Sequence, residues 1–138
     1  MPEAAPQTAK IILGVGCDRN TALQTLETAV DRALAETGHG RAAVTAMATI
    51  DKKSDEAALL ALSRKQDWPL LFYSAAQLAQ VEVPNPSEVV MKYMGTPAVS
   101  EAAAMLAAKT GIEDLLLEKY KYRGEDGKNA TVSIVRLR

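Results

Sequence analysis

The chain has 138 residues, and its 16 Lys and Arg against 17 Asp and Glu give a formal net charge of −1. This length suits one domain, and a content of 48% hydrophobic residues excludes a mainly disordered chain. The charge balance lacks the basic excess of duplex nucleic-acid binding, and no apolar run reaches the roughly 18 residues of a membrane span. We therefore expect a cytoplasmic protein with no nucleic-acid or membrane partner, no metal and no cofactor.

The N-terminal half alternates between apolar runs and amphipathic segments. Residues 1–9 are small and proline-bearing, which predicts a disordered tail before a single domain over residues 10–138. Alternating strands and helices are typical of a parallel sheet with helices on its faces. The predicted strands are 10–16, 44–50 and 69–73, and the predicted helices are 21–37, 54–65 and 74–81.

Short polar motifs predict where these helices begin. Residues 21–24 and 74–77 both have the form of a capping box, and Asn20 or Asp18 is an alternative cap for the first of these two helices. Ser54 is placed as an N-cap, with Asp55 and Glu56 in the first helical turn, where the helix dipole favours acidic side chains.

The C-terminal half departs from this alternation. Asn85 and Thr96 each precede a proline and are placed as the starts of two further helices. The predicted fold is therefore α/β: a three-layer α/β/α architecture with a mixed, mostly parallel sheet and a C-terminal antiparallel hairpin. The elements behind this prediction are helices over 85–94 and 96–110, strands over 115–122 and 130–137, and a turn-rich connection over 123–129.

Two loops are predicted to lie at the ligand-binding edge of this sheet. In open α/β sheets, ligands bind beyond the carboxyl ends of the strands. Residues 14–20 and 49–56 follow two of the predicted parallel strands, and each leads into a helix N-terminus with unpaired N–H groups. This combination favours a carboxylate or phosphate ligand.

The first of these loops contains two glycines. Gly14 and Gly16 are similar to a dinucleotide-binding fingerprint, but Arg19 stands where that fingerprint needs a small residue. We therefore interpret both glycines as permitting a tight turn from strand to helix. Cys17 is interpreted as a small buried residue, because the single histidine, His39, falls at the opposite sheet edge and cannot serve as its base.

The second loop carries charged residues with two interpretations each. Asp51, Asp55 and Glu56 form either an acid–base or metal-binding group or the charges of a helix start, which is the more common role. Lys52 and Lys53 either bind an anion or are solvated loop lysines.

Two lysines occur at a spacing of two on a predicted strand. Lys119 and Lys121 follow Leu115 and Leu117, so the strand face changes from apolar to basic. This pattern is equally consistent with protection of an edge strand against aggregation and with an anion-binding rim.

Five motifs, in order and at matching spacing, resemble the CobE/CbiG C-terminal family of cobalamin biosynthesis. The resemblance implies a three-layer α/β/α fold and a role in making the corrin ring of vitamin B12, with CobE in the aerobic route. It also implies that a longer relative, CbiG, opens a δ-lactone on a cobalt–precorrin intermediate and releases acetaldehyde. The motifs are GVGCDRNT (14–21), TIDKKSDE (49–56), PNPSEVV (84–90), GTPAVSEAAA (95–104), and EKYKY with ATVSIVR (118–122, 130–136).

A corrin precursor carries many carboxylates around a flat apolar ring. Its site needs N–H donors and cations at a rim above an apolar floor. Together with the loop analysis, the resemblance implies a set of candidate binding residues. They are Gly14, Gly16, Cys17, Arg19, Thr49, Asp51, Lys53, Glu56, Ser87, Glu88, Gly95, Thr96, Glu101 and Lys119.

Three hypotheses for the function follow. The first is a protein of the aerobic cobalamin pathway that binds a precorrin or corrin intermediate. The second is a hydrolase that opens a lactone or ester of such an intermediate, with Asp51 and Lys53 as candidate catalytic residues and helix N–H groups as the oxyanion site. The third is an interaction module that recruits a methyltransferase of the pathway.

Overall fold

A computed structural model describes residues 10–138; the predicted tail over residues 1–9 lies outside the described residues. One mixed sheet of five strands has the order β3-β2-β1-β5-β4. The pairs β1–β2 and β2–β3 are parallel, and β5 is antiparallel to both β1 and β4, so only β5 opposes the common strand direction. The strands are β1 (Lys10–Cys17), β2 (Val44–Ile50), β3 (Leu70–Tyr73), β4 (Leu115–Arg123) and β5 (Asn129–Leu137).

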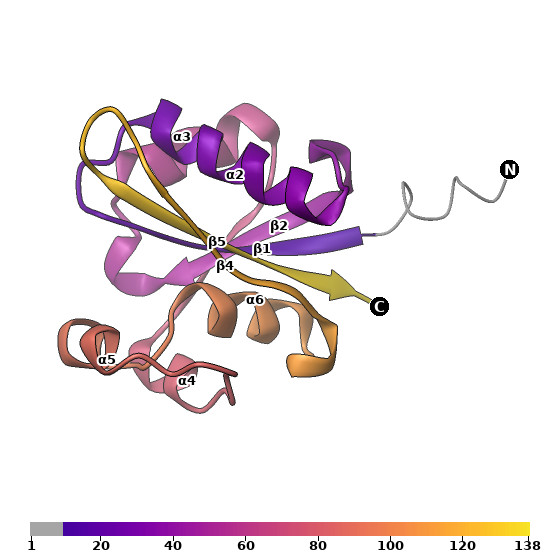
Figure 1. Cartoon of the computed structure of the whole chain (residues 1–138), viewed down its shortest axis with the longest axis vertical. Helices are drawn as coiled ribbons and strands as arrows, with labels where there is room; N and C mark the ends of the chain where they lie inside the picture. Colours follow the sequence, from indigo (N-terminus) through magenta and orange to yellow (C-terminus); the bar gives the residue numbers. More distant parts are fainter. Residues whose placement is uncertain (1–9) are drawn as a thin grey trace, which may run out of the picture.

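Helices cover both faces of this sheet, as Figure 1 shows. Helices α2 and α3 pack on one face, and α4 and α6 pack on the other, which gives the predicted three layers. Within residues 10–138, no helix combines the length and apolar character that crossing a bilayer requires. The helices are α2 (Leu23–Thr37), α3 (Ala57–Gln66), α4 (Ala75–Ala79), α5 (Glu88–Met94) and α6 (Ser100–Ala108), with short 3-10 turns η1 (Arg41–Ala43), η2 (Asp51–Lys53) and η3 (Ile112–Asp114).

The central strand β1 is buried on both faces because it lies between the two helix layers. Ile11, Leu13 and Val15 point into the core beneath α2 and α3, whereas Ile12 points into the core beneath α6. This arrangement follows from the alternation of side chains along a strand, and it explains why the β1 sequence is continuously apolar.

Gly14 allows α6 to approach β1 closely. A Cβ atom on Gly14 would lie 1.7 Å from the carbonyl oxygen of Ser100, which is the first residue of α6. The interpretation of Gly14 and Gly16 as turn residues is wrong, because both lie within β1 and neither has a positive φ. A glycine inside a strand instead marks the place where another backbone comes near.

The N-cap residues predicted for α2 and α3 are wrong. Helix α2 begins at Leu23 without a side-chain cap, and the N–H group of Ala22 donates to Asp126 Oδ2 at 2.8 Å. Helix α3 begins at Ala57 rather than after Ser54, because residues 51–53 form the turn η2. At α2, a contact with a residue distant in sequence therefore takes the place of the local cap that the motif predicts.

The remaining helix starts include one confirmed motif. The capping box of α4 is present: the Ser74 hydroxyl accepts from the Gln77 N–H group, and the Gln77 side chain accepts from the Ser74 N–H group. Helix α5 begins at Glu88 with Ser87 as its N-cap, so Asn85 is not the cap. Thr96 does not start α6, because its hydroxyl donates to the carbonyl of Ala98 ahead of that helix.

Candidate functional site

The loops that follow β1 and β2 meet at one edge of the sheet, as predicted. Arg19 Nη1 lies 2.7 Å from Asp55 Oδ1 and 3.3 Å from Glu56 Oε1. The N–H group of Asn20 donates to Glu56 Oε2 at 3.0 Å. A hydrogen bond from Arg19 lowers the pKa of the Asp55 carboxyl below its ordinary value. Arg19 thus joins the two loops rather than presenting a free cation to a ligand.

A cavity of about 270 Å³ opens at the carboxyl ends of the strands. Its walls come from the ends of β1 and β2, from β4 and β5, from α5, and from the turn into α6. Its apolar lining is Ile50, Val90, Met94, Pro97, Ala98 and Val99. Its charged lining is Asp18, Lys53, Glu101, Lys119 and Lys121.

Cations predominate among the charged groups of this cavity, with three ammonium groups against two carboxylates. Within residues 10–138, neither Lys53 nor Lys121 forms an ion pair. Lys119 Nζ lies 3.4 Å from Glu101 Oε2. The Asp18 carboxylate accepts two hydrogen bonds from Asn129, at 2.8 and 3.0 Å. Two ammonium groups are therefore left to bind an anion.

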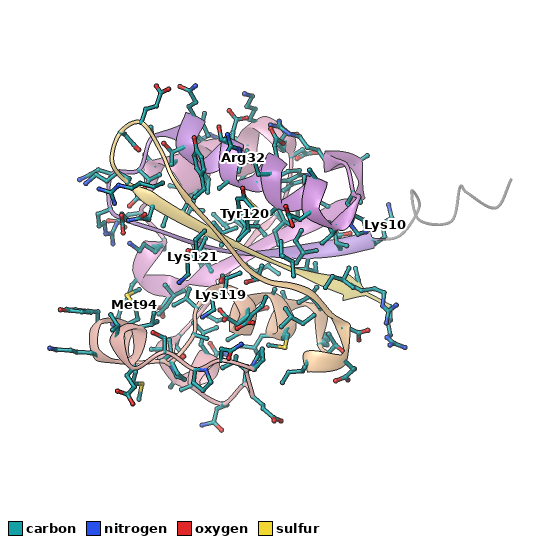
Figure 2. The ribbon with its side chains drawn as sticks, in the orientation of Figure 1. Lys10, Arg32, Met94, Lys119, Tyr120 and Lys121 are labelled. Carbon is teal, nitrogen blue, oxygen red and sulfur yellow. The ribbon has the colours of Figure 1, made fainter. Side chains whose placement is uncertain are left out.

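Strand β4 presents its two lysines on the cavity side. Figure 2 shows Lys119 and Lys121 on the α6 side of β4, and Tyr120 packs on the α2 side. The expected apolar-to-basic face is wrong at Leu117, which packs beneath α2 on the opposite face from Lys119. The cause is an irregular register of β4 against β5 on either side of Leu117. As an edge strand that also lines a cavity, β4 fits both interpretations of its lysines.

Cys17 lines the cavity and is half-buried. Burial raises the pKa of its thiol above the ordinary value, and the charge of Lys53 partly offsets that effect. The His39 ring lies 2.8 Å from the Thr37 hydroxyl, after the C-terminal end of α2. Because the pKa of the Cys17 thiol is raised and His39 lies beside Thr37 instead, the thiol stays protonated at neutral pH.

The structure brings six of the predicted site residues to the cavity and leaves eight outside its lining. Thr49 is fully buried, and its hydroxyl donates to the Val15 carbonyl at 2.6 Å, which ties β2 to β1. The lining residues are Gly16, Cys17, Lys53, Ser87, Glu101 and Lys119. Those outside are Gly14, Arg19, Thr49, Asp51, Glu56, Glu88, Gly95 and Thr96.

The apolar residues that line the cavity are not among the predicted site residues. Val90 and Met94 come from α5, and Val99 comes from the turn before α6. Lys121 is absent from the predicted site residues, although it lies two residues from Lys119 and within the EKYKY motif. In the part of the chain that the structure describes, no cluster of three His, Cys, Asp or Glu side chains is arranged as metal ligands.

Fold and cavity together define an α/β/α domain with a lysine-rich cavity at the carboxyl ends of its strands. Residues 11–135 match the family described as "Cobalamin synthesis G C-terminus". The chain belongs to this family of cobalamin biosynthesis proteins.

Two characterised relatives agree with this membership. The chain is 36% identical over 124 residues to the cobalt-precorrin-5A hydrolase of Priestia megaterium, a match that covers 90% of this chain and 31% of that protein. It is 35% identical over 102 residues to Protein CobE of Sinorhizobium sp, covering 72% of this chain and 66% of that protein. The chain thus spans less than two thirds of the length of either relative.

Solved structures confirm the predicted fold class. The crystal structure of CobE, a protein from the cobalamin (vitamin B12) biosynthetic pathway, has a TM-score of 0.79 at 32% identity, covering 94% of this chain and 92% of that one. Cobalamin biosynthesis protein chiG from Agrobacterium tumefaciens str. C58 has a TM-score of 0.62 at 26% identity, covering 90% and 95%. A putative cobalamin biosynthesis protein G homologue from Sulfolobus solfataricus shares the fold at 15% identity, with a TM-score of 0.67 and coverage of 94% and 37%.

Proposed function

We propose that this chain binds a tetrapyrrole intermediate of cobalamin biosynthesis in the cavity at the carboxyl ends of its strands. The observation that carries the proposal is the pair Lys53 and Lys121, which line the cavity and form no ion pair within residues 10–138. Two ammonium groups of this kind attract the acetate and propionate groups around such a macrocycle. The family to which the chain belongs supplies the pathway.

The apolar wall suits the ring itself. Ile50 comes from the end of β2, Val90 and Met94 come from α5, and all three line the same cavity as the lysines. Sites for small molecules combine such an apolar lining with a few polar groups that fix orientation. A volume of about 270 Å³ is slightly smaller than such sites usually have, which is roughly 300 Å³ upward, so we expect it to take one edge of the macrocycle.

The structure brings only one of the two candidate catalytic residues of the hydrolase hypothesis to the cavity. Asp51, one of its two candidate catalytic residues, does not line the cavity, whereas Lys53 does. Binding is therefore the function that the geometry supports best. The aerobic route and the cytoplasmic location stay predictions, as does recruitment of a pathway methyltransferase.

An absorption titration tests the proposal. The protein is titrated into cobyrinic acid, a corrin with carboxylates at its periphery, and the visible spectrum is followed at low and high salt. We expect the double variant Lys53→Ala/Lys121→Ala to bind about tenfold more weakly, because charge-assisted contacts each contribute on the order of 1.5–3 kcal/mol before solvent screening.

A charge-matched control separates the cavity from net charge. The variant Lys10→Ala/Lys109→Asn removes two exposed lysines that do not line the cavity, and Asn tolerates the left-handed conformation that Lys109 adopts. We expect it to bind as the native protein does. Absence of binding by the native protein, or equal weakening by both double variants, contradicts the proposal.

A further inference from the structure

Glu101 is a buried carboxylate, and one of its two oxygens accepts no hydrogen bond from residues 10–138. Its side chain is 2% exposed and lines the cavity from the first turn of α6. Among the described residues, no group donates a hydrogen bond to Glu101 Oε2. The ammonium group of Lys119 lies 3.4 Å away, beyond the usual N–H···O range of about 2.7–3.2 Å. A buried acceptor in this state costs free energy unless something donates to it.

The other carboxylate oxygen of Glu101, Oε1, accepts only one long hydrogen bond from the part of the chain that the structure describes. The Ser100 hydroxyl donates to Glu101 Oε1 at 3.2 Å, and it also lies 2.8 Å from the Ser133 hydroxyl. The Ser133 hydroxyl in turn contacts the carbonyl of Glu118. The Ser100 and Ser133 hydroxyls have two protons between them for these three contacts. The Glu101 carboxylate therefore has fewer hydrogen-bond donors than it can accept.

Two other buried carboxylates of the fold accept hydrogen bonds on both oxygens, and Glu27 Oε2, which like Glu101 Oε2 has no hydrogen-bond donor among the described residues, lies 2.9 Å from Lys65 Nζ and outside the cavity. Asp114 accepts from Arg136 at 2.9 Å and from Arg138 at 2.7 Å, and it also contacts the Thr110 hydroxyl. Glu56 accepts on one oxygen from the Asn20 N–H group and on the other from Arg19. Of Asp114, Glu56 and Glu101, the one that lacks a donor is the one that lines the cavity.

Glu101 is also held in place. The Ser100 carbonyl lies against Gly14 of β1, and the Ser100 hydroxyl lies against Ser133 of β5. The first turn of α6 therefore has little freedom to move the carboxylate toward Lys119. An acceptor fixed in this way distinguishes ligands by whether they present a donor to it.

We infer that Glu101 Oε2 accepts a hydrogen bond from the bound ligand, so that the cavity selects polycarboxylates that also carry a neutral O–H or N–H donor. This inference rests on the proposed function. Carboxylates of the ligand lie against Lys53 and Lys121, and the donor lies against Glu101. A ligand that places a second carboxylate at Glu101 is repelled, because two like charges are then desolvated together.

Two related probes test this selection. Cobyrinic acid carries carboxylates at its periphery, and in its a,c-diamide some of these carboxylates are replaced by carboxamides, which have N–H donors. We expect the native protein to bind the diamide about tenfold more tightly than the acid, which corresponds to a net gain of one hydrogen bond to a charged group. In Glu101→Gln we expect less than about threefold preference, because the Gln amide both donates and accepts.

Further variants and outcomes keep the test decisive. Glu82→Gln, an exposed glutamate that does not line the cavity, is expected to retain the native preference. Glu101→Asp keeps the charge but shortens the side chain, so it also loses the preference, and it decides the question if Glu101→Gln does not fold by circular dichroism. Equal binding of both probes by the native protein, or an unchanged preference in the Glu101 variants, overturns this inference alone. Binding of neither probe overturns the proposed function, and the inference with it.

Discussion

Gly14 of β1 and Ser100 of α6 touch backbone to backbone. A Cβ atom on Gly14 would lie 1.7 Å from the Ser100 carbonyl oxygen and 3.0 Å from the Ala104 Cβ atom. This contact sets the distance between the sheet and α6, and it places Glu101 at the cavity. The absence of one side chain in β1 therefore supports the geometry of the candidate site.

Gly14→Ala is expected to destabilise the protein strongly. The added methyl group has to displace the backbone of α6, and overpacking of this kind costs about 3 kcal/mol or more. Urea unfolding followed by circular dichroism measures the loss. Gly16→Ala is the matched control, because its nearest atom would be Val99 Cγ1 at 3.9 Å, and we expect a loss below about 1 kcal/mol. Equal losses in the two variants would show that the close approach of α6 is unimportant.

Glu56→Gln is expected to loosen the junction of the two loops. Glu56 is buried, accepts the Asn20 N–H group at 3.0 Å and pairs with Arg19 at 3.3 Å. Loss of the charge leaves those donors poorly satisfied, at a cost of about 1–3 kcal/mol in the free energy of unfolding.

The comparison for that variant is Asp55→Asn, at the other acidic partner of Arg19. Asp55 is 78% exposed, so solvent screens its ion pair and we expect a smaller loss of stability. Thermal unfolding of the two variants side by side is the measurement. A larger loss for Asp55→Asn than for Glu56→Gln would refute the structural role given to Glu56.

Asp114 is expected to make stability depend on pH in acid. Hydrogen bonds from Thr110, Arg138 and Arg136 lower the pKa of Asp114 from 3.8 to about 2. Because the folded-state pKa lies below the unfolded value, the stabilisation is fully present above pH 3.8 and is lost as the pH falls toward about 2.

Asp114→Asn isolates this contribution. We expect the difference in the free energy of unfolding between the native protein and Asp114→Asn to be largest near neutral pH and to shrink between pH 3.8 and about 2. Urea unfolding of both proteins across that interval provides the comparison. A difference that stays constant over the interval would mean that Asp114 does not titrate as described.

The strands and their common edge could be predicted from the sequence because the signals are local. Continuous apolar runs at β1 and β2 and the hairpin turn between β4 and β5 identify the strands, and their alternation with helices fixes the parallel part of the sheet. The parallel direction then brings the loops after β1 and β2 to one edge, which the contact between Arg19 and Glu56 confirms.

The helix starts and the cavity lining could not be predicted in the same way, because they depend on residues distant in sequence. Asp126, from the turn between β4 and β5, accepts from Ala22 at the start of α2 and so replaces a local cap. The alanine-rich sequence of α6 gives no sign that Gly14 receives its backbone. Glu101 matches a family motif, but its lack of a donor is visible only once α6, β4 and β5 are packed together.

The central claim is that a tetrapyrrole polycarboxylate binds in this one cavity, and the most direct test is to locate it on the protein. Backbone amide chemical shifts of ¹⁵N-labelled protein are recorded during titration with cobyrinic acid. We predict that the largest changes fall at Gly16, Lys53, Ser87, Lys121 and Thr131, which line the cavity. Changes concentrated around Asp114 and Arg136, at the other end of β5, or no changes at all, would contradict the account.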